Sequence, residues 1–167
     1  DLESFLARCR DVLLPEREKR IPPQRDDKVL ADWNGLAVAA MAKAAAVFSR
    51  PDWLTEAERV FDFIVNELSA SDGRLHHTWC AGRAAHPGVL EDYANLGRAA
   101  LALHQATGNS AYLDRARAFV DTLNAHFWDD ANGGYFMAAD DTPDLLTRSP
   151  TAARSAQRWL VSVAADG

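Results

Sequence analysis

The sequence has few cysteines, no excess of positive charge and no long apolar run. Its only two cysteines, Cys9 and Cys80, are too few for a disulfide framework and lack the spacing of a zinc site or a redox pair. We therefore expect free thiols, as in a reducing cytoplasm. No apolar run is long enough to cross a membrane, and no stretch resembles a signal peptide, so we expect no membrane partner.

The charge balance argues against nucleic acid as a partner. The formal net charge is −6, and the local basic run in residues 16–20 is diluted by two glutamates. The 167 residues correspond to one domain, and a hydrophobic content of 48% can fill a sizeable core, so we do not expect disorder. The chain begins at Asp1 inside an apparent helix, which suggests a fragment of a longer protein.

A long internal repeat organises the chain. Leu30–Trp33 aligns with Leu90–Tyr93 at an offset of 60, and the alanines that follow keep this register. After a one-residue deletion in a turn, residues 53–68 align with residues 112–127. A repeat of this length indicates stacked supersecondary units.

Apolar periodicity predicts helices, and two of them are apolar on all or most sides. The expected helices are residues 1–14, ended or bent by Pro15; 33–48; a helix after the tight turn at 49–52, with Asp52 as N-cap; 90–107; and 110–127. The helix at 33–48 should be buried all round and that at 90–107 nearly so, whereas their successors are amphipathic. One more helix is expected after Arg148.

The connections carry turn and strand signals. Residues 69–89 predict a β-hairpin with its turn at Asp72-Gly73 or Ala81-Gly82. Residues 129–134 predict a turn and Tyr135–Met137 a short strand. The longer connections all fall on one side of the helices, the side on which the two apolar helices begin, and such connections usually hold binding groups.

Alternating buried and half-exposed helices suit an inner and an outer ring. The expected fold is all-α: a partial (α/α) toroid of tandem helical hairpins with short β-hairpins in the loops on one face. A tetratricopeptide superhelix competes, but its period is much shorter than 60 residues. We expect a single domain, 1–167, with a leading loop at 15–32, repeats at 33–89 and 90–148, and a divergent tail at 149–167.

Several motifs resemble one family of large cytoplasmic proteins, which fuse a thioredoxin-like domain to a helical toroid and include the spermatogenesis-associated thioredoxin-like proteins. The matching segments are Asp26–Lys28, Trp33–Leu36, Asp72–Leu75, Gly88–Ala94 and Gly133–Phe136. The toroid of this family is similar to six-hairpin glycosidases and N-acylglucosamine 2-epimerases, which implies a carbohydrate-type funnel. The thioredoxin-like domain is absent, and the tail after Arg148 departs from the family pattern. The chain would hold roughly two and a half of six helical pairs.

Polar and aromatic side chains near the funnel mouth are the candidate site. The candidate catalytic residues are Asp27, His77, Glu91 and Asp92, and the candidate substrate-binding residues are Asp26, Lys28, Trp33, Asn34, Trp79, Tyr93 and Arg148. Glycoside hydrolysis needs two carboxylates, and Glu91-Asp92 and Asp26-Asp27 offer such pairs. A histidine with a pKa near neutrality could act as a base. We expect no metal and no cofactor.

Each candidate also has a structural alternative. Asp32 and Asp92 could cap helices, and Asp27 could pair with Lys28. Core packing competes with sugar stacking for Trp33 and Tyr93, whereas Trp79 lies on the hairpin and suits a platform. His76 and His77 should point to opposite faces of a strand and so cannot share one metal. His86, Arg83 and Arg148 are ambiguous.

Three hypotheses about function follow. The first is a fragment of a carbohydrate-handling toroid, epimerase- or glycosidase-like, acting on a sugar-like small molecule by proton transfer. The second is a non-catalytic toroid that binds a sugar or a protein and serves a thioredoxin-like domain. The third is an inactive fragment that forms homo-oligomers through exposed inner-helix faces.

Overall fold

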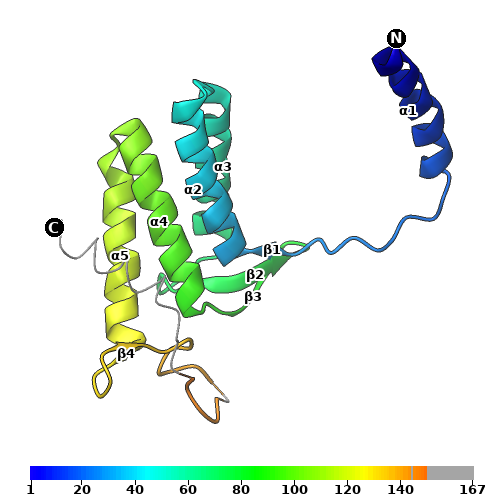
Figure 1. Cartoon of the computed structure of the whole chain (residues 1–167). Coiled ribbons are helices and arrows are strands. Elements are labelled where there is room, and N and C mark those ends of the chain that lie inside the picture. Colours follow the sequence, from blue (N-terminus) through cyan, green and yellow to red (C-terminus); the bar gives the residue numbers. More distant parts are fainter. Residues whose placement is uncertain (144, 150–167) are drawn as a thin grey trace.

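The computed structural model describes residues 1–143 and 145–149, and its core is two helical hairpins packed side by side (Figure 1). The first hairpin pairs α2 (Ala31–Val47) with α3 (Pro51–Glu67), and the second pairs α4 (Leu90–Thr107) with α5 (Ser110–His126). The most extensive packing between elements is that of α2 on α4. This arrangement confirms the all-α fold of tandem hairpins, and the expected tail helix lies outside the described residues.

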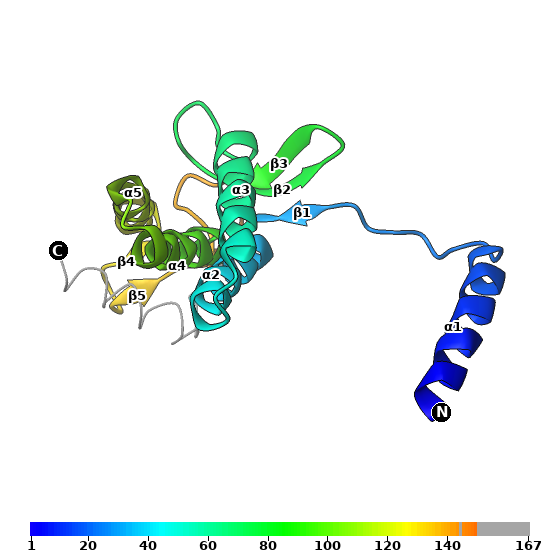
Figure 2. The same cartoon turned by 90° about the horizontal axis from the view of Figure 1, so that it is seen from above.

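Helix α1 (Leu2–Glu18) stands apart from this bundle, at the end of an extended segment (Figures 1 and 2). It has no buried residue. Pro15 was expected to end or bend this helix. It does not end it, because α1 continues to Glu18. A proline in the last turn removes only one hydrogen bond near a terminus, which the remaining turns tolerate.

The two short turns between paired helices are built differently. Gly108 follows α4 with a φ of 72°, the left-handed conformation that ends many helices. Asn109 then caps α5 by accepting the N–H of Ala111 at 3.0 Å. Asp52 was expected to cap α3 but lies inside its first turn, after Pro51, and binds the Arg50 guanidinium instead.

The strands gather at the end of the bundle where α2 and α4 begin (Figure 1). β1 (Val29–Leu30), β2 (His76–Cys80) and β3 (Arg83–Pro87) form an antiparallel sheet in that order. Ala81-Gly82 is the hairpin turn, and both residues have positive φ, as a type I′ turn requires. β4 (Trp128–Asp129) pairs with β5 (Gly134–Tyr135), so the strand expected at Tyr135–Met137 begins one residue earlier and ends two residues earlier.

The two inner helices differ in burial. Helix α4 is buried on nearly all sides, because α2, α3 and α5 all contact it. The expectation that α2 is buried all round is wrong in this chain: Trp33 is 68% exposed, Leu36 44% and Val47 76%. Among the described residues, α2 contacts the helices α3 and α4 and the strands β1 and β2, and its remaining side is exposed. No helix among the described residues is both long and apolar enough to cross a bilayer.

Tyr93 joins α4 to the segment that precedes β2. Its ring is fully buried and meets Phe119 and Phe127 edge-on. Its hydroxyl oxygen accepts the N–H of Leu75 at 2.9 Å and the Nε–H of Arg74 at 3.3 Å. The ring packs in the core, as its structural alternative held, and leaves no open face for a sugar.

We expect Tyr93→Phe to lower the free energy of unfolding by about 1–3 kcal/mol, because the buried Leu75 N–H loses its acceptor. Urea titration followed by circular dichroism would measure the change. Tyr135→Phe is the control, since that hydroxyl donates to Asn124 at the surface, where water can replace the lost bond. Equal losses in the two variants would contradict the role given to Tyr93.

Candidate functional site

Asp92 is the point at which the two inner helices meet. It lies in the first turn of α4 and is fully buried. One carboxylate oxygen accepts the N–H of Val89 at 2.7 Å, and the other accepts the N–H of Asp32 at 3.0 Å. These are free donors at the starts of α4 and α2, so one side chain caps both helices. Asp92 is not the N-cap residue of α4, which is Val89, but lies three residues inside the helix and reaches back to the Val89 N–H.

His77 completes this cluster from β2. Its Nδ1 lies 3.0 Å from both carboxylate oxygens of Asp92, and its side chain is 31% exposed. Its neighbour His76 has a buried Nδ1 without a partner among the described residues. Adjacent residues of a strand alternate in direction, which explains why only His77 reaches Asp92.

Burial raises the pKa of Asp92 to about 6. The charge of Asp32 acts in the same direction, whereas the hydrogen bonds from Val89 and His77 lower the pKa. At neutral pH the carboxylate is therefore ionised and accepts the proton on Nδ1 of His77. This fixes the imidazole tautomer and leaves Nε2 as the free acceptor, which is the arrangement of a general base held by a carboxylate.

Asp32, His77 and Asp92 could also be considered as metal ligands, since one donor atom from each lies within 4.8 Å of the others. However, both Asp92 oxygens already accept backbone N–H groups and face Nδ1 of His77. Asp32 Oδ1 accepts the N–H of Trp33 at 2.7 Å. These hydrogen bonds already occupy both Asp92 oxygens and Asp32 Oδ1, and we assign no metal to the cluster.

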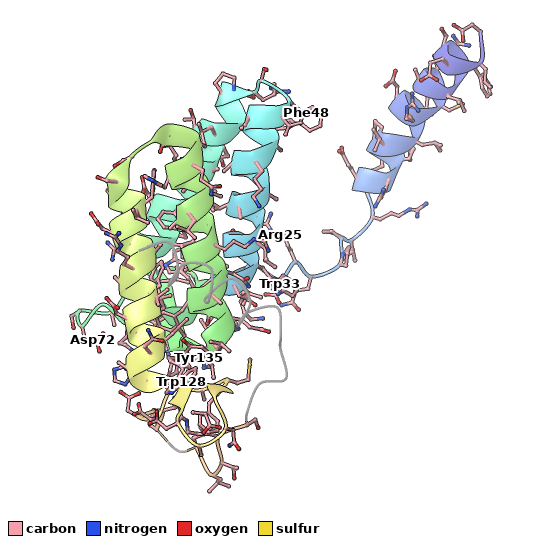
Figure 3. All side chains as sticks on the ribbon, turned by 60° about the vertical axis from the view of Figure 1, so that its left-hand side comes forward. Arg25, Trp33, Phe48, Asp72, Trp128 and Tyr135 are labelled. Carbon is pink, nitrogen blue, oxygen red and sulfur yellow. The ribbon has the colours of Figure 1, made fainter. Side chains whose placement is uncertain are left out.

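Two tryptophans lie near this end of the bundle. Trp79 on β2 is half-buried, with its ring edge-on to Phe63 at a centroid distance of 5.3 Å. Trp33 projects from the start of α2, largely exposed (Figure 3). Core packing was an alternative for Trp33, but this chain leaves most of its ring open. Exposed aromatic faces of this kind suit the C–H faces of sugar rings.

The acidic residues of the leading loop are not brought into the cluster. Lys28 pairs with Asp26 at 2.8 Å, and Arg25 pairs with Asp27, all at exposed positions. The expected pair between Asp27 and Lys28 is therefore wrong: Lys28 takes the neighbour two residues away. The Lys28 ammonium lowers the pKa of Asp26 through their hydrogen bond. Sequence spacing could not decide between two adjacent acids.

Two of the remaining candidates, Asn34 and Arg148, make contacts within the fold. Asn34 donates to the carbonyl oxygen of Leu30 at 2.8 Å, and Glu91 lies half-buried beside Asp92. Arg148 donates to the carbonyl oxygens of Ala138 and His126, and its guanidinium lies 4.1 Å from the ring centroid of Phe136. Arg148 thus fastens the C-terminal segment to the end of α5. Its predicted role in substrate binding is not tested by these contacts.

One supporting residue was not anticipated from the sequence. Arg74 binds Asp141 through two hydrogen bonds of 3.0 and 3.1 Å and also reaches the Tyr93 hydroxyl. It links three distant segments just before β2 and so helps to hold the strand that carries His77. Its position after Asp72-Gly73 marks a turn, but nothing local indicates a partner 67 residues away.

Comparison with known proteins identifies relatives of this fold. The family model for N-acylglucosamine 2-epimerase (GlcNAc 2-epimerase) matches residues 31–155. Spermatogenesis-associated protein 20 from Rattus norvegicus and from Homo sapiens is 35% identical over 137 residues, which is 77% of this chain and 17% of either relative. The chain therefore spans about a sixth of the length of these curated relatives.

Solved structures show the same architecture. A sugar epimerase from a ruminal bacterium superposes with a TM-score of 0.67 at 15% identity, covering 87% of this chain and 40% of that one. Cellobiose 2-epimerase from Spirochaeta thermophila superposes with a TM-score of 0.63 at 20% identity, covering 77% of this chain and 35% of that one. The glycoside hydrolase family 76 α-mannanase of Bacteroides thetaiotaomicron superposes with a TM-score of 0.62 at 19% identity, covering 71% of this chain and 34% of that one. At these identities the likeness shows the fold.

Proposed function

The chain belongs to the N-acylglucosamine 2-epimerase family, and from this premise we propose that it is part of a carbohydrate-handling (α/α) toroid that moves a proton at a sugar carbon. The observation that supports this most is the His77–Asp92 pair at the end of the bundle where the inner helices begin. His77 would act as the base through Nε2, and Asp92 would hold its tautomer from behind.

Proton transfer suits this pair better than glycoside hydrolysis does. Hydrolysis needs two carboxylates that flank a bond of the substrate. Asp92 is fully buried and Asp32 nearly so, and both accept backbone N–H groups, so neither can reach a glycosidic oxygen. A histidine that is partly exposed and held by a buried carboxylate can reach a sugar C–H and needs no second acid of the same kind.

The test is solvent deuterium exchange into the sugar carbon, followed by NMR, with the complete polypeptide that contains the closed ring. N-acetylglucosamine and cellobiose are the first probes. His77→Asn keeps a donor close to the Nδ1 position and removes Nε2, and we expect it to lower the exchange rate by about 10²–10⁴-fold. His86→Asn, which removes an exposed imidazole from β3, should leave the rate unchanged.

Full exchange activity in His77→Asn would contradict the proposal. A urea titration of the same variant separates chemistry from folding. Because the asparagine amide can still donate to Asp92, the free energy of unfolding should change by less than about 1 kcal/mol. A loss of activity that merely follows a loss of stability would also count against a role for His77 as base.

A binding toroid without catalysis is the second candidate, and the satisfaction of Asp92 by two backbone N–H groups favours it. In that case Trp33 and Trp79 would bind a sugar or a protein on behalf of a thioredoxin-like domain in a cytoplasmic protein. This candidate predicts that the probe sugars bind, measured by titration calorimetry, while no deuterium is exchanged. Exchange lost specifically in His77→Asn would rule it out.

A further inference from the structure

Helix α1 has an apolar stripe that is exposed along its length in the described part of the chain. Leu2, Phe5, Leu6, Val12 and Leu13 recur at helical spacing and are all exposed, Phe5 by 54%. A single helix of 17 residues is marginal in water without a packing partner. Its stripe is the pattern of a helix that packs on another element.

Helix α2 offers a face of matching length. Its exposed side is formed by Trp33, Leu36, Ala37, Ala40, Lys43, Ala44 and Val47, which recur every three or four residues. Only one of these positions carries a charge. The three central alanines are small, whereas the stripe of α1 is large, and large side chains on one helix pack well against small ones on the other.

In the second repeat the corresponding face of the inner helix is covered. The positions of α4 that correspond to Trp33, Leu36, Ala37 and Ala40 at the offset of 60 are all buried. Helix α4 contacts three helices: the inner helix α2, the preceding helix α3 and the following helix α5. Helix α2 contacts the inner helix α4 and its own following helix, α3. Its preceding helix, α1, stands away from it (Figure 2).

We propose that α1 docks antiparallel on the exposed face of α2 in the same chain, in the place that α3 has beside α4. With Glu18 level with Ala31, Cys9 lies opposite Ala40, and the rest of the α1 stripe falls on the α2 face. The connection of residues 19–28 can span roughly 33 Å when extended. Packed helices are only about 8–10 Å apart, so the chain reaches easily.

Disulfide trapping tests the docking, because Cys9 is already in place. The protein carries Ala40→Cys as its new thiol and Cys80→Ser to remove the exposed native one. Under mild oxidation we expect most of the protein to form an intramolecular Cys9 disulfide, seen as a faster monomer band without reductant and confirmed by mass spectrometry. Ala118→Cys, at an exposed position of α5, is the matched control and should not form this bond.

A second substitution shows whether apolar packing causes the bond. Ala37→Asp adds a charge to the α2 face and should lower the yield of the Cys9 disulfide about tenfold, since docking would bury that charge. Ala37 is exposed on the bundle itself, so the variant should keep the helical content of the two hairpins, which circular dichroism would check. An unchanged yield would mean that α1 meets α2 only by random encounter, and the proposal would fail.

Two other outcomes would overturn the proposal. Absence of the bond in the Ala40→Cys protein would show that α1 does not lie on this face. A bond formed only between two copies would show that the face mediates self-association, as the third hypothesis from the sequence expects. Light scattering on the unmodified chain separates these outcomes, because docking within one chain predicts a monomer.

Discussion

Gly35→Ala is expected to lower the free energy of unfolding by about 3 kcal/mol, although it adds a single methyl group. A Cβ at this position would lie 2.8 Å from the backbone carbon of Asn95 and 2.9 Å from the backbone nitrogen of Leu96. Both atoms belong to the backbone of α4, so no side chain can rotate away. Helices α2 and α4 would have to separate along their main contact.

The sign of this effect makes the test sharp. Inside an unpacked helix, replacing glycine by alanine stabilises by up to about 1 kcal/mol, because alanine restricts the unfolded chain. A stabilised or unchanged Gly35→Ala protein in urea titration would therefore show that α2 and α4 do not approach this closely. Ala118→Leu is a suitable control, since a larger side chain at an exposed position of α5 should change stability by less than about 0.5 kcal/mol.

The helices and their pairing could be predicted because local signals agree with the fold. Gly108 and Asn109 mark the turn between α4 and α5, and the expected bounds 90–107 match α4. The offset of 60 predicted that α2 and α4 play equivalent roles, which their packing confirms. Ala81-Gly82 was one of two turn candidates, and positive φ at both residues made it the hairpin turn.

Burial of α2 could not be predicted in the same way. An apolar sequence on all sides says that a helix is suited to burial, but exposure depends on which neighbours are present. Among the described helices, α4 contacts α2, α3 and α5, whereas α2 contacts α3 and α4. Trp33 is largely exposed, whereas its repeat equivalent Tyr93 is fully buried against Phe119 and Phe127.

The geometry of the candidate site was only partly predictable. Strand alternation correctly separated His76 from His77, and capping was a correct general expectation for Asp92. The hydrogen bond from the Asp32 N–H to Asp92 crosses from one repeat to the other. No local pattern specifies such a contact, because it depends on how closely the two inner helices pack.

Asp92→Ala is expected to cost about 5 kcal/mol at pH 4, because two buried N–H groups, at Val89 and Asp32, lose their acceptor at once. The proteins compared should both carry His77→Asn, so that the imidazole does not titrate in the same range. Urea titrations at several pH values would measure the difference in the free energy of unfolding.

This difference should shrink as the pH rises, and the direction follows from the raised pKa. Burial raises the pKa of Asp92 from 3.8 to about 6, so the folded protein holds the proton more tightly than the unfolded chain does. The resulting stabilisation is complete below pH 4 and is lost between pH 4 and pH 6, by about 3 kcal/mol. Asp92→Ala should therefore cost only about 2 kcal/mol at pH 7.

Asp129→Ala supplies a control of opposite sign. Hydrogen bonds from Asn132 and Ala131 lower the pKa of Asp129, so its contribution is present at neutral pH and lost as the pH falls through the lowered pKa. A difference for Asp92→Ala that stays flat from pH 4 to pH 7, or that grows with pH like that of Asp129→Ala, would show that Asp92 is not held in a desolvated cap. The carboxylate would then lack the environment needed to fix His77.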